Sequence, residues 1–392
     1  NVIDLKELVD RLCQRGLQLP VLVRFNGILR DRLNHLNDCF AKAIEESQYR
    51  NRYRCVFPIK VNQQRDVVRQ IASESRKLGF GIEAGSKPEF LAAIAMSDVT
   101  VPVVCPGFKD EEYIRLALMA DRMGRTVIPV IEKASELDLI LRVASEVGVR
   151  PTFGMRVKLA TRGSGRWQAS GGYRSKFGLT VGEILSALDR LVEMDLADCF
   201  QLLHFHVGSQ IGNIRQLKSA ILEAARVYVD LKRRGAAMGY LDVGGGLGVD
   251  YDGSQSDTES SMNYTIQEYA NDVVCHVQSV CDEANVPHPE LISESGRAVA
   301  AQHSVLVVET LGVTRQGCPA PAGSERLPDE YEQPVHDLWS THNDLSMENM
   351  IESLHDGQAA LDLCINLFCG GYLPLEQRVA AESLYFSLCH RI

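Results

Sequence analysis

Between about residues 54 and 295, short apolar runs alternate with longer stretches of helical periodicity. Runs rich in β-branched residues predict eight strands, at 54–60, 79–83, 100–105, 126–131, 152–158, 200–207, 240–243 and 290–294. The stretches between them predict helices, at 65–77, 86–96, 110–123, 134–147, 181–195, 213–235 and 265–285. The pattern is clearest in 213–235, where Ile214, Leu217 and Ile221 recur on one helical face.

This regular alternation predicts parallel β/α units whose strands are buried on both faces. Eight strands are the number that closes a (β/α)8 barrel, and a span of about 240 residues suits that fold. An open doubly wound sheet is the alternative, but it needs no particular strand count. We therefore expect an α/β chain built on a TIM barrel.

The segments on either side of the predicted barrel follow a different pattern. An apolar run at 22–25 predicts a strand, which leads into a helix ending near Ser47, and 304–314 predicts a further strand. Because the chain starts with Asn1 and stops within a helical pattern, we expect both ends to be borders of a fragment. We divide the chain into an N-terminal strand and helix (1–53), the barrel (54–300), an extra strand (301–316), a Pro- and Gly-rich loop or linker (317–334) and a helical segment broken at 370–371 (335–392).

Composition narrows the range of functions. The chain is 45% apolar and 23% charged, as is usual for a globular protein, and its net charge of −10 argues against nucleic acid as a partner. It has no apolar run of the ~18 residues that a membrane span needs, and no signal-peptide pattern. The 11 cysteines are scattered without a Cys-x-x-Cys motif, so we expect no metal site and reduced thiols in a cytoplasm.

In a TIM barrel the chemistry lies at the carboxyl ends of the strands. Lys60 closes the first predicted strand, and partial desolvation there would lower its pKa and make the amine nucleophilic. The alternative is a lysine at the end of a strand that reaches solvent. Gly244, Gly245 and Gly246 follow the seventh strand and could form a phosphate-binding turn, although a tight turn explains them equally well.

Further polar residues share this rim. Ser209 and Arg297 offer a hydroxyl and a guanidinium suited to phosphate. His206 could stack on a ring, act as an acid or base, or be a core residue, and the same holds for His204. Glu294 needs a partner, either Arg297 or a cationic heterocycle. Together these residues predict a pyridoxal phosphate site.

Five long segments, in order along the chain, resemble a known family: 57–63, 81–89, 202–210, 242–251 and 294–298. They are similar to the fold-type III pyridoxal phosphate enzymes, the superfamily of alanine racemase and the ornithine and diaminopimelate decarboxylases. Within it they resemble the biosynthetic arginine decarboxylases of bacteria and plants. Short segments at 354–356 and 382–385 are also similar to the bacterial enzymes.

The resemblance implies roles for individual residues. Lys60 would carry the Schiff base, His206 would stack on the cofactor ring, and Glu294 would pair with the pyridine nitrogen. The phosphate would be bound by Ser209, Gly244, Gly245, Gly246, Gly296 and Arg297. On the substrate side the resemblance places Glu83, Arg156, Asp242, Gly248 and Asp250, with Lys87 close by.

The resemblance further implies decarboxylation of L-arginine to agmatine and CO₂ in polyamine biosynthesis. It implies a cytoplasmic homodimer or larger homo-oligomer with shared sites, and possible use of Mg²⁺. The 301–316 strand would begin a β-domain whose cysteine motif lies beyond Ile392, so none of the cysteines is assigned as catalytic and we expect little turnover from residues 1–392 alone. The alternatives are a decarboxylase of ornithine, lysine or diaminopimelate, and a non-catalytic homologue that binds pyridoxal phosphate.

Overall fold

Eight parallel strands form a closed barrel in the order in which they occur along the chain. The computed structural model describes residues 3–161, 175–314 and 327–392. The chain divides into two units, and the boundary between them falls after Val307. The barrel strands are β2 (Tyr53–Pro58), β3 (Gly81–Glu83), β4 (Val103–Cys105), β5 (Val127–Ile131), β6 (Phe153–Arg156), β7 (Phe200–His204), β8 (Tyr240–Asp242) and β9 (Glu290–Ser293). Pairing of β2 with β9 closes the ring, so the predicted TIM barrel is confirmed.

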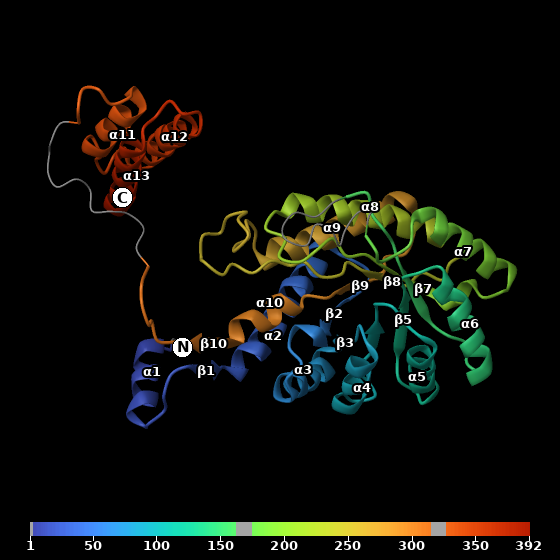
Figure 1. Cartoon of the computed structure of the whole chain (residues 1–392). Coiled ribbons are helices and arrows are strands. Elements are labelled where there is room, and N and C mark those ends of the chain that lie inside the picture. The colour runs from blue at the N-terminus through green and yellow to red at the C-terminus, as the bar shows by residue number, and fades with distance from the viewer. Residues whose placement is uncertain (1–2, 162–174, 315–326) are drawn as a thin grey trace. The chain divides into compact units, whose positions relative to one another are not determined.

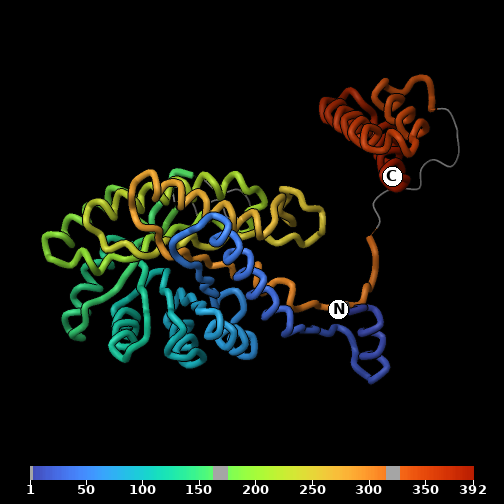
Figure 2. The backbone as a smooth tube through the Cα atoms, turned by 180° about the vertical axis from the view of Figure 1, so that it is seen from behind, coloured from blue at the N-terminus to red at the C-terminus, as the bar shows by residue number. Residues whose placement is uncertain are grey.

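The helices surround the barrel, and Figures 1 and 2 show them as a ring around the strands. Glycines in left-handed conformation end α3 and α6, at Gly79 and Gly148, and a Thr180–Glu183 capping box begins α7. The ring consists of α2 (Asn26–Ser47), α3 (Arg65–Leu78), α4 (Lys87–Met96), α5 (Glu111–Arg122), α6 (Ser135–Val147), α7 (Val181–Glu193), α8 (Ile214–Arg233) and α9 (Ile266–Ala284).

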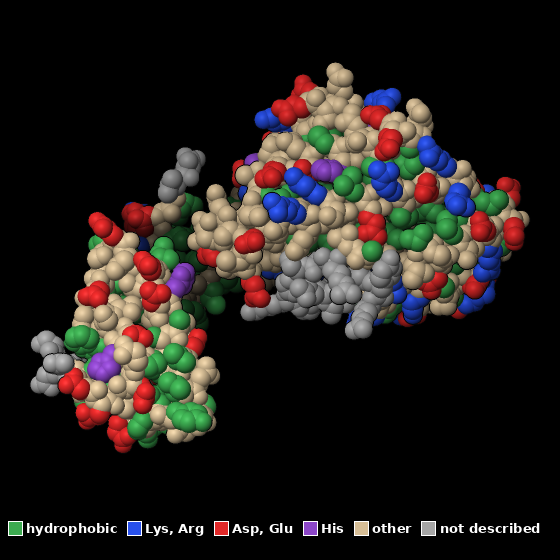
Figure 3. All heavy atoms as spheres, turned by 90° about the horizontal axis from the view of Figure 1, so that it is seen from above, with side chains coloured by type: hydrophobic (Ala, Val, Ile, Leu, Met, Phe, Trp, Pro, Cys, Tyr) green, Lys and Arg blue, Asp and Glu red, His purple; other side chains and the backbone are tan. Residues whose placement is uncertain are grey.

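The strands are buried because apolar residues cover both of their faces. Every residue of β5 is buried, and so is every residue of β9, including the polar Glu290 and Ser293 at its ends. Inside the ring, Val56, Val104 and Leu202 pack together with neighbouring strand residues. On the barrel face drawn in Figure 3, basic and acidic side chains are interspersed. Exposed ion pairs contribute about 0–1 kcal/mol each, so the apolar interior is the main source of stability.

A two-stranded antiparallel sheet lies beside the barrel in the same unit. It pairs β1 (Val21–Arg24) with β10 (Ser304–Val307), and α1 (Leu5–Gln14) precedes it (Figure 1). The predicted strand at 304–314 is therefore shorter than expected. Its partner comes from the N-terminal segment, which sequence patterning could not reveal because the two strands are about 280 residues apart. Between the barrel and this sheet lie α10 (Gly296–Ala300) and the one-turn helix η4 (Ala301–His303).

The second unit contains a small helical bundle of α11 (Gln333–Asn343), α12 (Met350–Cys369) and α13 (Leu375–Arg391). The helices enclose a core that includes Val335, Leu338 and Leu384. The predicted break falls between α12 and α13, where Gly371 has a φ of +78°. The predicted linker at 317–334 lies mostly outside the described residues, and its end is corrected because Gln333 and Pro334 already belong to α11.

No described helix is long and apolar enough to cross a membrane.

Two boundaries in the barrel differ from the sequence prediction in ways that affect the site. β2 ends at Pro58, and Lys60 lies in the following one-turn helix η1 (Ile59–Val61) rather than within the strand. β7 ends at His204, so His206 lies in the loop after the strand and strand alternation does not set its direction. A further one-turn helix, η3 (Ala197–Cys199), precedes β7.

Candidate active site

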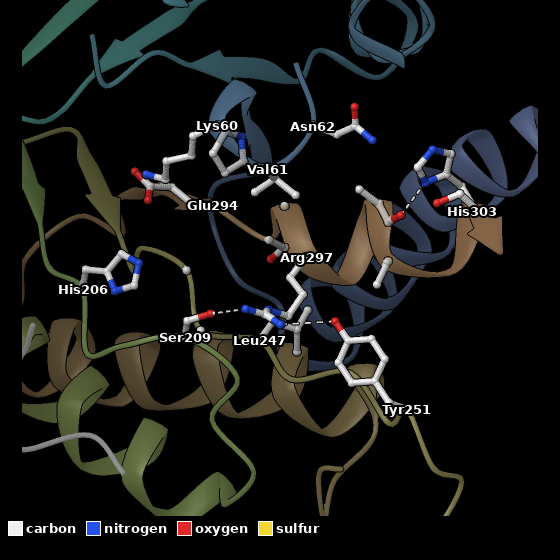
Figure 4. A pocket seen from close by; sticks show the side chains of 18 residues that line it. Lys60, Val61, Asn62, His206, Ser209, Leu247, Tyr251, Glu294, Arg297 and His303 are labelled. Carbon is white, nitrogen blue, oxygen red and sulfur yellow. Dashed lines mark hydrogen bonds between the residues drawn. The ribbon is translucent and has the colours of Figure 1, made fainter. Parts of the chain in front are cut away.

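Two adjoining cavities open at the carboxyl ends of the barrel strands, one of about 500 Å³ and one of about 380 Å³. Figure 4 shows the larger one, with Lys60 and Glu294 on one side and the Ser209–Arg297–Tyr251 chain on the other. Lys60, His206, Ser209 and Glu294 line both cavities. Of the other predicted site residues, Gly245, Gly246, Gly296 and Arg297 line the larger cavity, and Glu83 and Arg156 line the smaller one.

Lys60 and Glu83 form an ion pair across the ends of β2 and β3. Lys60 Nζ lies 3.0 Å from Glu83 Oε2, with the lysine side chain 51% exposed and the glutamate fully buried. Burial raises the pKa of Glu83 to about 8, an effect that Glu294 strengthens and Lys60 opposes. Burial also lowers the pKa of Lys60, but Glu83 and Glu294 outweigh it and the net shift is upward. The expected lowered pKa of Lys60 is therefore wrong for this arrangement, because two carboxylates surround the amine.

The glycine turn after β8 brings the backbone unusually close to its neighbours. A Cβ on Gly244 would lie 2.2 Å from Phe205 O, and the φ of Gly244 is +66°. A Cβ on Gly246, whose φ is +106°, would lie 2.6 Å from Ile211 Cδ1. Only glycine fits at both positions. The close packing of this turn therefore requires the glycines. Asp242 Oδ1 fixes the turn by accepting the Gly244 N–H at 2.9 Å.

Arg297 joins this rim to two hydroxyls. Its guanidinium donates to Ser209 Oγ at 3.0 Å and to Tyr251 Oη at 3.2 Å (Figure 4). Arg297 is one of the two partners that the sequence suggests for Glu294. In the structure its guanidinium is turned toward the two hydroxyls instead. A guanidinium, a hydroxyl and the glycine turn together offer an anion several donors.

His206 presents a neutral ring between the two cavities. Its Nδ1 accepts the Gly208 N–H at 3.0 Å. Burial lowers its pKa well below the usual value, and nearby Arg156, His204 and Lys60 lower it further. A Cβ on Gly245 would lie 3.2 Å from His206 Nε2, so glycine leaves open the space beside the ring.

Glu294 belongs to a buried triad with His204 and Asp242. His204 Nδ1 lies 3.0 Å from Asp242 Oδ2 and 3.9 Å from Glu294 Oε1. Burial raises the pKa of Glu294 and Asp242 raises it further, while His204 opposes both. Burial lowers the pKa of His204, but Asp242 and Glu294 outweigh it and the net shift is upward. These three are the one group of potential metal ligands found among the described residues.

Arg156 lies at the smaller cavity between a carboxylate and a ring. Its Nη1 is 3.3 Å from Glu132 Oε1, and its guanidinium carbon is 5.3 Å from the centre of the Phe177 ring. Sequence reasoning missed Glu132, although it directly follows β5 and an inventory of every strand end would have included it. It also missed Tyr251, which only its contact with Arg297 reveals.

The remaining predicted residues lie near the site without lining either cavity. Asp250 Oδ1 accepts from the Gly253 N–H at 2.9 Å and from Ser261 Oγ at 2.7 Å, which orders the loop after β8. Gly248 donates its N–H to Tyr264 Oη at 3.0 Å. Lys87 pairs with Asp110 and Glu112 at the exposed starts of neighbouring helices.

The set fits pyridoxal phosphate. An amine stands at the cavity wall, an anion site of guanidinium, hydroxyl and glycine turn lies across from it, and a buried carboxylate completes the set. The space beside the His206 ring would be filled by any side chain at position 245. A barrel with these groups at the carboxyl ends of its strands defines a cofactor-binding α/β barrel.

The chain belongs to the family described as "Pyridoxal-dependent decarboxylase, pyridoxal binding domain", whose model matches residues 33–301. A second model, "Arginine decarboxylase helical bundle domain", matches residues 328–392. The chain is 70% identical to the biosynthetic arginine decarboxylase of Rhodopirellula baltica and 47% identical to that of a Nostoc species, in both cases over its full length. It spans 63% and 57% of the lengths of these relatives.

Solved structures agree with this assignment. The biosynthetic arginine decarboxylase from Campylobacter jejuni is 33% identical and superposes with a TM-score of 0.72, over 99% of this chain and 64% of that one. Diaminopimelate decarboxylase from Helicobacter pylori, crystallised with L-lysine, has a TM-score of 0.61 at 18% identity, over 77% of this chain and 68% of that one. At that identity the second similarity concerns the fold alone.

Proposed function

We propose that the protein decarboxylates L-arginine to agmatine and CO₂ with pyridoxal phosphate. The observation that supports this most strongly is the convergence of Lys60, Glu294 and the Arg297–Ser209 pair on one cavity at the barrel rim. The names of the relatives at 70% and 47% identity favour arginine over other amino acids.

The cofactor would be held at both of its ends. Arg297, Ser209 and the Gly244–Gly246 turn would bind the phosphate, because they supply cationic and neutral donors to one anion. The amine of Lys60 would bond to the aldehyde carbon. His206, which is neutral and anchored through Nδ1, would lie against the ring face.

When bound, pyridoxal phosphate supplies a conjugated ring that accepts the electron pair left as the Cα–carboxylate bond breaks. Glu294 would hold a proton at the ring nitrogen, because a carboxylate in a buried site favours a cation beside it. Glu83 is placed to take a proton from Lys60 Nζ, 3.0 Å away, and so to release the amine for bonding. Glu83 and Arg156 would face the substrate from the smaller cavity.

The assembly and location are part of the same proposal. We expect a homo-oligomer with shared sites, as the family resemblance implies. All ten described cysteines are unpaired, which supports a reducing compartment such as the cytoplasm. Asp242, Gly248 and Asp250 act through the loop after β8 rather than by touching substrate, since they order its backbone.

A competition assay tests the proposal. The purified protein, supplied with pyridoxal phosphate, is given equal concentrations of L-arginine, L-ornithine, L-lysine and meso-diaminopimelate, and the amine products are quantified. We expect agmatine to dominate. Equal turnover of the four substrates would refute the choice of arginine, and retention of the cofactor without any turnover would support the non-catalytic alternative.

A further inference from the structure

The triad of His204, Asp242 and Glu294 is fully enclosed, with side chains 1%, 0% and 2% exposed. The three residues come from adjacent positions in the barrel: His204 ends β7, Asp242 ends β8 opposite it, and Glu294 follows β9. His204 Nδ1, Asp242 Oδ2 and Glu294 Oε1 each lack a well-formed hydrogen bond among the described residues. These polar atoms therefore lie within 4.8 Å of one another without well-formed hydrogen bonds between them.

Without a positive charge on His204, the triad would contain two carboxylates and no cation. Asp242 and Glu294 have carboxylate oxygens within 4.8 Å of each other in a buried site, and their mutual repulsion favours protonation of one of them. Arg156 on β6, the register neighbour of His204, pairs with Glu132, which directly follows β5. Lys60 on η1 pairs with Glu83 from β3, and burial lowers the pKa of His206 well below its usual value, which disfavours a charge on that ring. Lys60 and Arg156 also favour the charged form of Glu294, but each of them pairs with another carboxylate. The imidazole of His204 is the group that lies against both Asp242 and Glu294, so it is the one placed to neutralise one of the two carboxylates.

We propose that His204, as an imidazolium, is a positioning residue that keeps Glu294 ionised beside the ring nitrogen of pyridoxal phosphate. The proposal rests on the proposed function, because it concerns the cofactor bound in this cavity. His204 acts through Glu294 and need not touch the ring itself.

Hydrogen bonding decides which of the two carboxylates would become protonated if the imidazolium were absent. Asp242 Oδ1 accepts the Gly244 N–H at 2.9 Å, and such a bond favours the charged form of Asp242. Glu294 Oε1, the oxygen that faces His204, has no hydrogen-bond partner among the described residues. Without His204⁺, Glu294 would take the proton, and a protonated carboxyl would no longer stabilise a proton on the ring nitrogen.

The direct test is the protonation state of that nitrogen. The protein is reconstituted with pyridoxal phosphate labelled with ¹⁵N in the ring, and the ¹⁵N chemical shift is followed between about pH 6 and pH 9. We expect a protonated nitrogen throughout in the wild type. In His204→Gln we expect the midpoint to fall into this range, to about pH 9 or below, which is about one pH unit or more under that of the wild type and a tenfold loss of proton affinity. An unchanged titration in His204→Gln would overturn the proposal.

A double variant separates charge balance from structural damage. His204→Gln/Asp242→Asn removes both the imidazolium and the carboxylate that repels Glu294. Charge balance predicts that the ring nitrogen regains at least half of its lost proton affinity, whereas a purely structural role predicts that the second change worsens the loss. A double variant no better than His204→Gln would therefore contradict the proposal.

His288 provides a matched control. Its fully buried side chain places Nε2 3.0 Å from Asp282 Oδ1, the same distance as in the His204–Asp242 pair, but it does not line either cavity. His288→Gln should leave the ring nitrogen unchanged. A shift as large as that of His204→Gln would show a general effect of losing a buried histidine and would count against the proposal.

Two further measurements keep the test decisive. If His204→Gln does not fold, ¹⁵N-histidine spectra of the wild type, assigned through the backbone, report the state directly, and a neutral His204 at about pH 7 overturns the proposal. The same spectra are readable if the wild type does not retain the cofactor, which would refute the proposed function instead. A stoichiometric divalent metal that survives dialysis and is lost in His204→Gln would make the triad a metal site and also overturn the proposal.

Discussion

Lys60 Nζ lies 3.0 Å from Glu83 Oε2, so that a half-exposed amine shares its charge with a carboxylate that has no access to solvent. The two groups come from neighbouring strands, since Pro58 of β2 is in register with Glu83 of β3. The carboxylate carries most of the desolvation penalty of the pair.

This relationship makes stability depend on pH. Burial raises the pKa of folded Glu83 from 4.5 to about 8, so the folded state keeps a proton that the unfolded state releases above 4.5. The corresponding stability is present below that pH and is lost as the pH rises toward 8. We expect Glu83→Gln to remove this loss. As the pH rises, the free energy of unfolding of the variant should therefore increase relative to that of the wild type, by up to about 1.4 kcal/mol per pH unit. Urea unfolding at about pH 5, 6.5 and 8 checks this. The same dependence of the unfolding free energy on pH in the variant and the wild type would contradict it.

Lys60 is expected to be the covalent attachment point of the cofactor. Lys60→Ala should still bind pyridoxal phosphate through Arg297 and Ser209, but it should lose the visible absorbance band of the attached cofactor. Absorbance spectra before and after borohydride reduction and dialysis measure the attachment. A normal band in Lys60→Ala would refute the assignment, and Lys87→Ala, whose amine pairs with Asp110 away from the cavities, is the control.

Arg297 is expected to recognise the phosphate. Charged hydrogen bonds contribute about 1.5–3 kcal/mol, so Arg297→Ala should weaken the affinity for pyridoxal phosphate by about 10- to 100-fold. The affinity for pyridoxal, which lacks the phosphate, should stay unchanged. Tyr251→Phe removes only the hydroxyl that Arg297 contacts and should have a smaller effect. Equal losses for both ligands in Arg297→Ala would show that the site itself has been damaged.

Gly244 is expected to be irreplaceable because of the close approach of the Phe205 carbonyl. Gly244→Ala should destabilise the protein by roughly 3 kcal/mol or more, since both a left-handed φ and a backbone clash oppose the methyl group. Gly253 has a similar φ of +78° but open space around it, so Gly253→Ala should cost only about 1 kcal/mol. Thermal and urea unfolding measure both, and similar costs would show that the clash is relieved by backbone movement.

Much of the fold was readable from the sequence. Each of the eight predicted strands and seven intervening helices has a counterpart, because burial on both faces produces apolar runs and burial on one face produces helical periodicity. The errors lie at strand ends. Lys60 and His206 fall just beyond β2 and β7, where the apolar pattern continues past the last ladder hydrogen bond.

The sequence by itself determined the barrel, the helical segment and the set of polar groups at the rim, because strand order and residue type are local properties of the chain. Only the tertiary structure decided how those groups pair. It turned Arg297 toward Ser209 and Tyr251, set Glu83 against Lys60, and joined Glu294 to His204 and Asp242. The reason is that a charge in a barrel interior is governed by the distance and burial of its neighbours, and closing the ring brings together residues as far apart as Lys60 and Glu294.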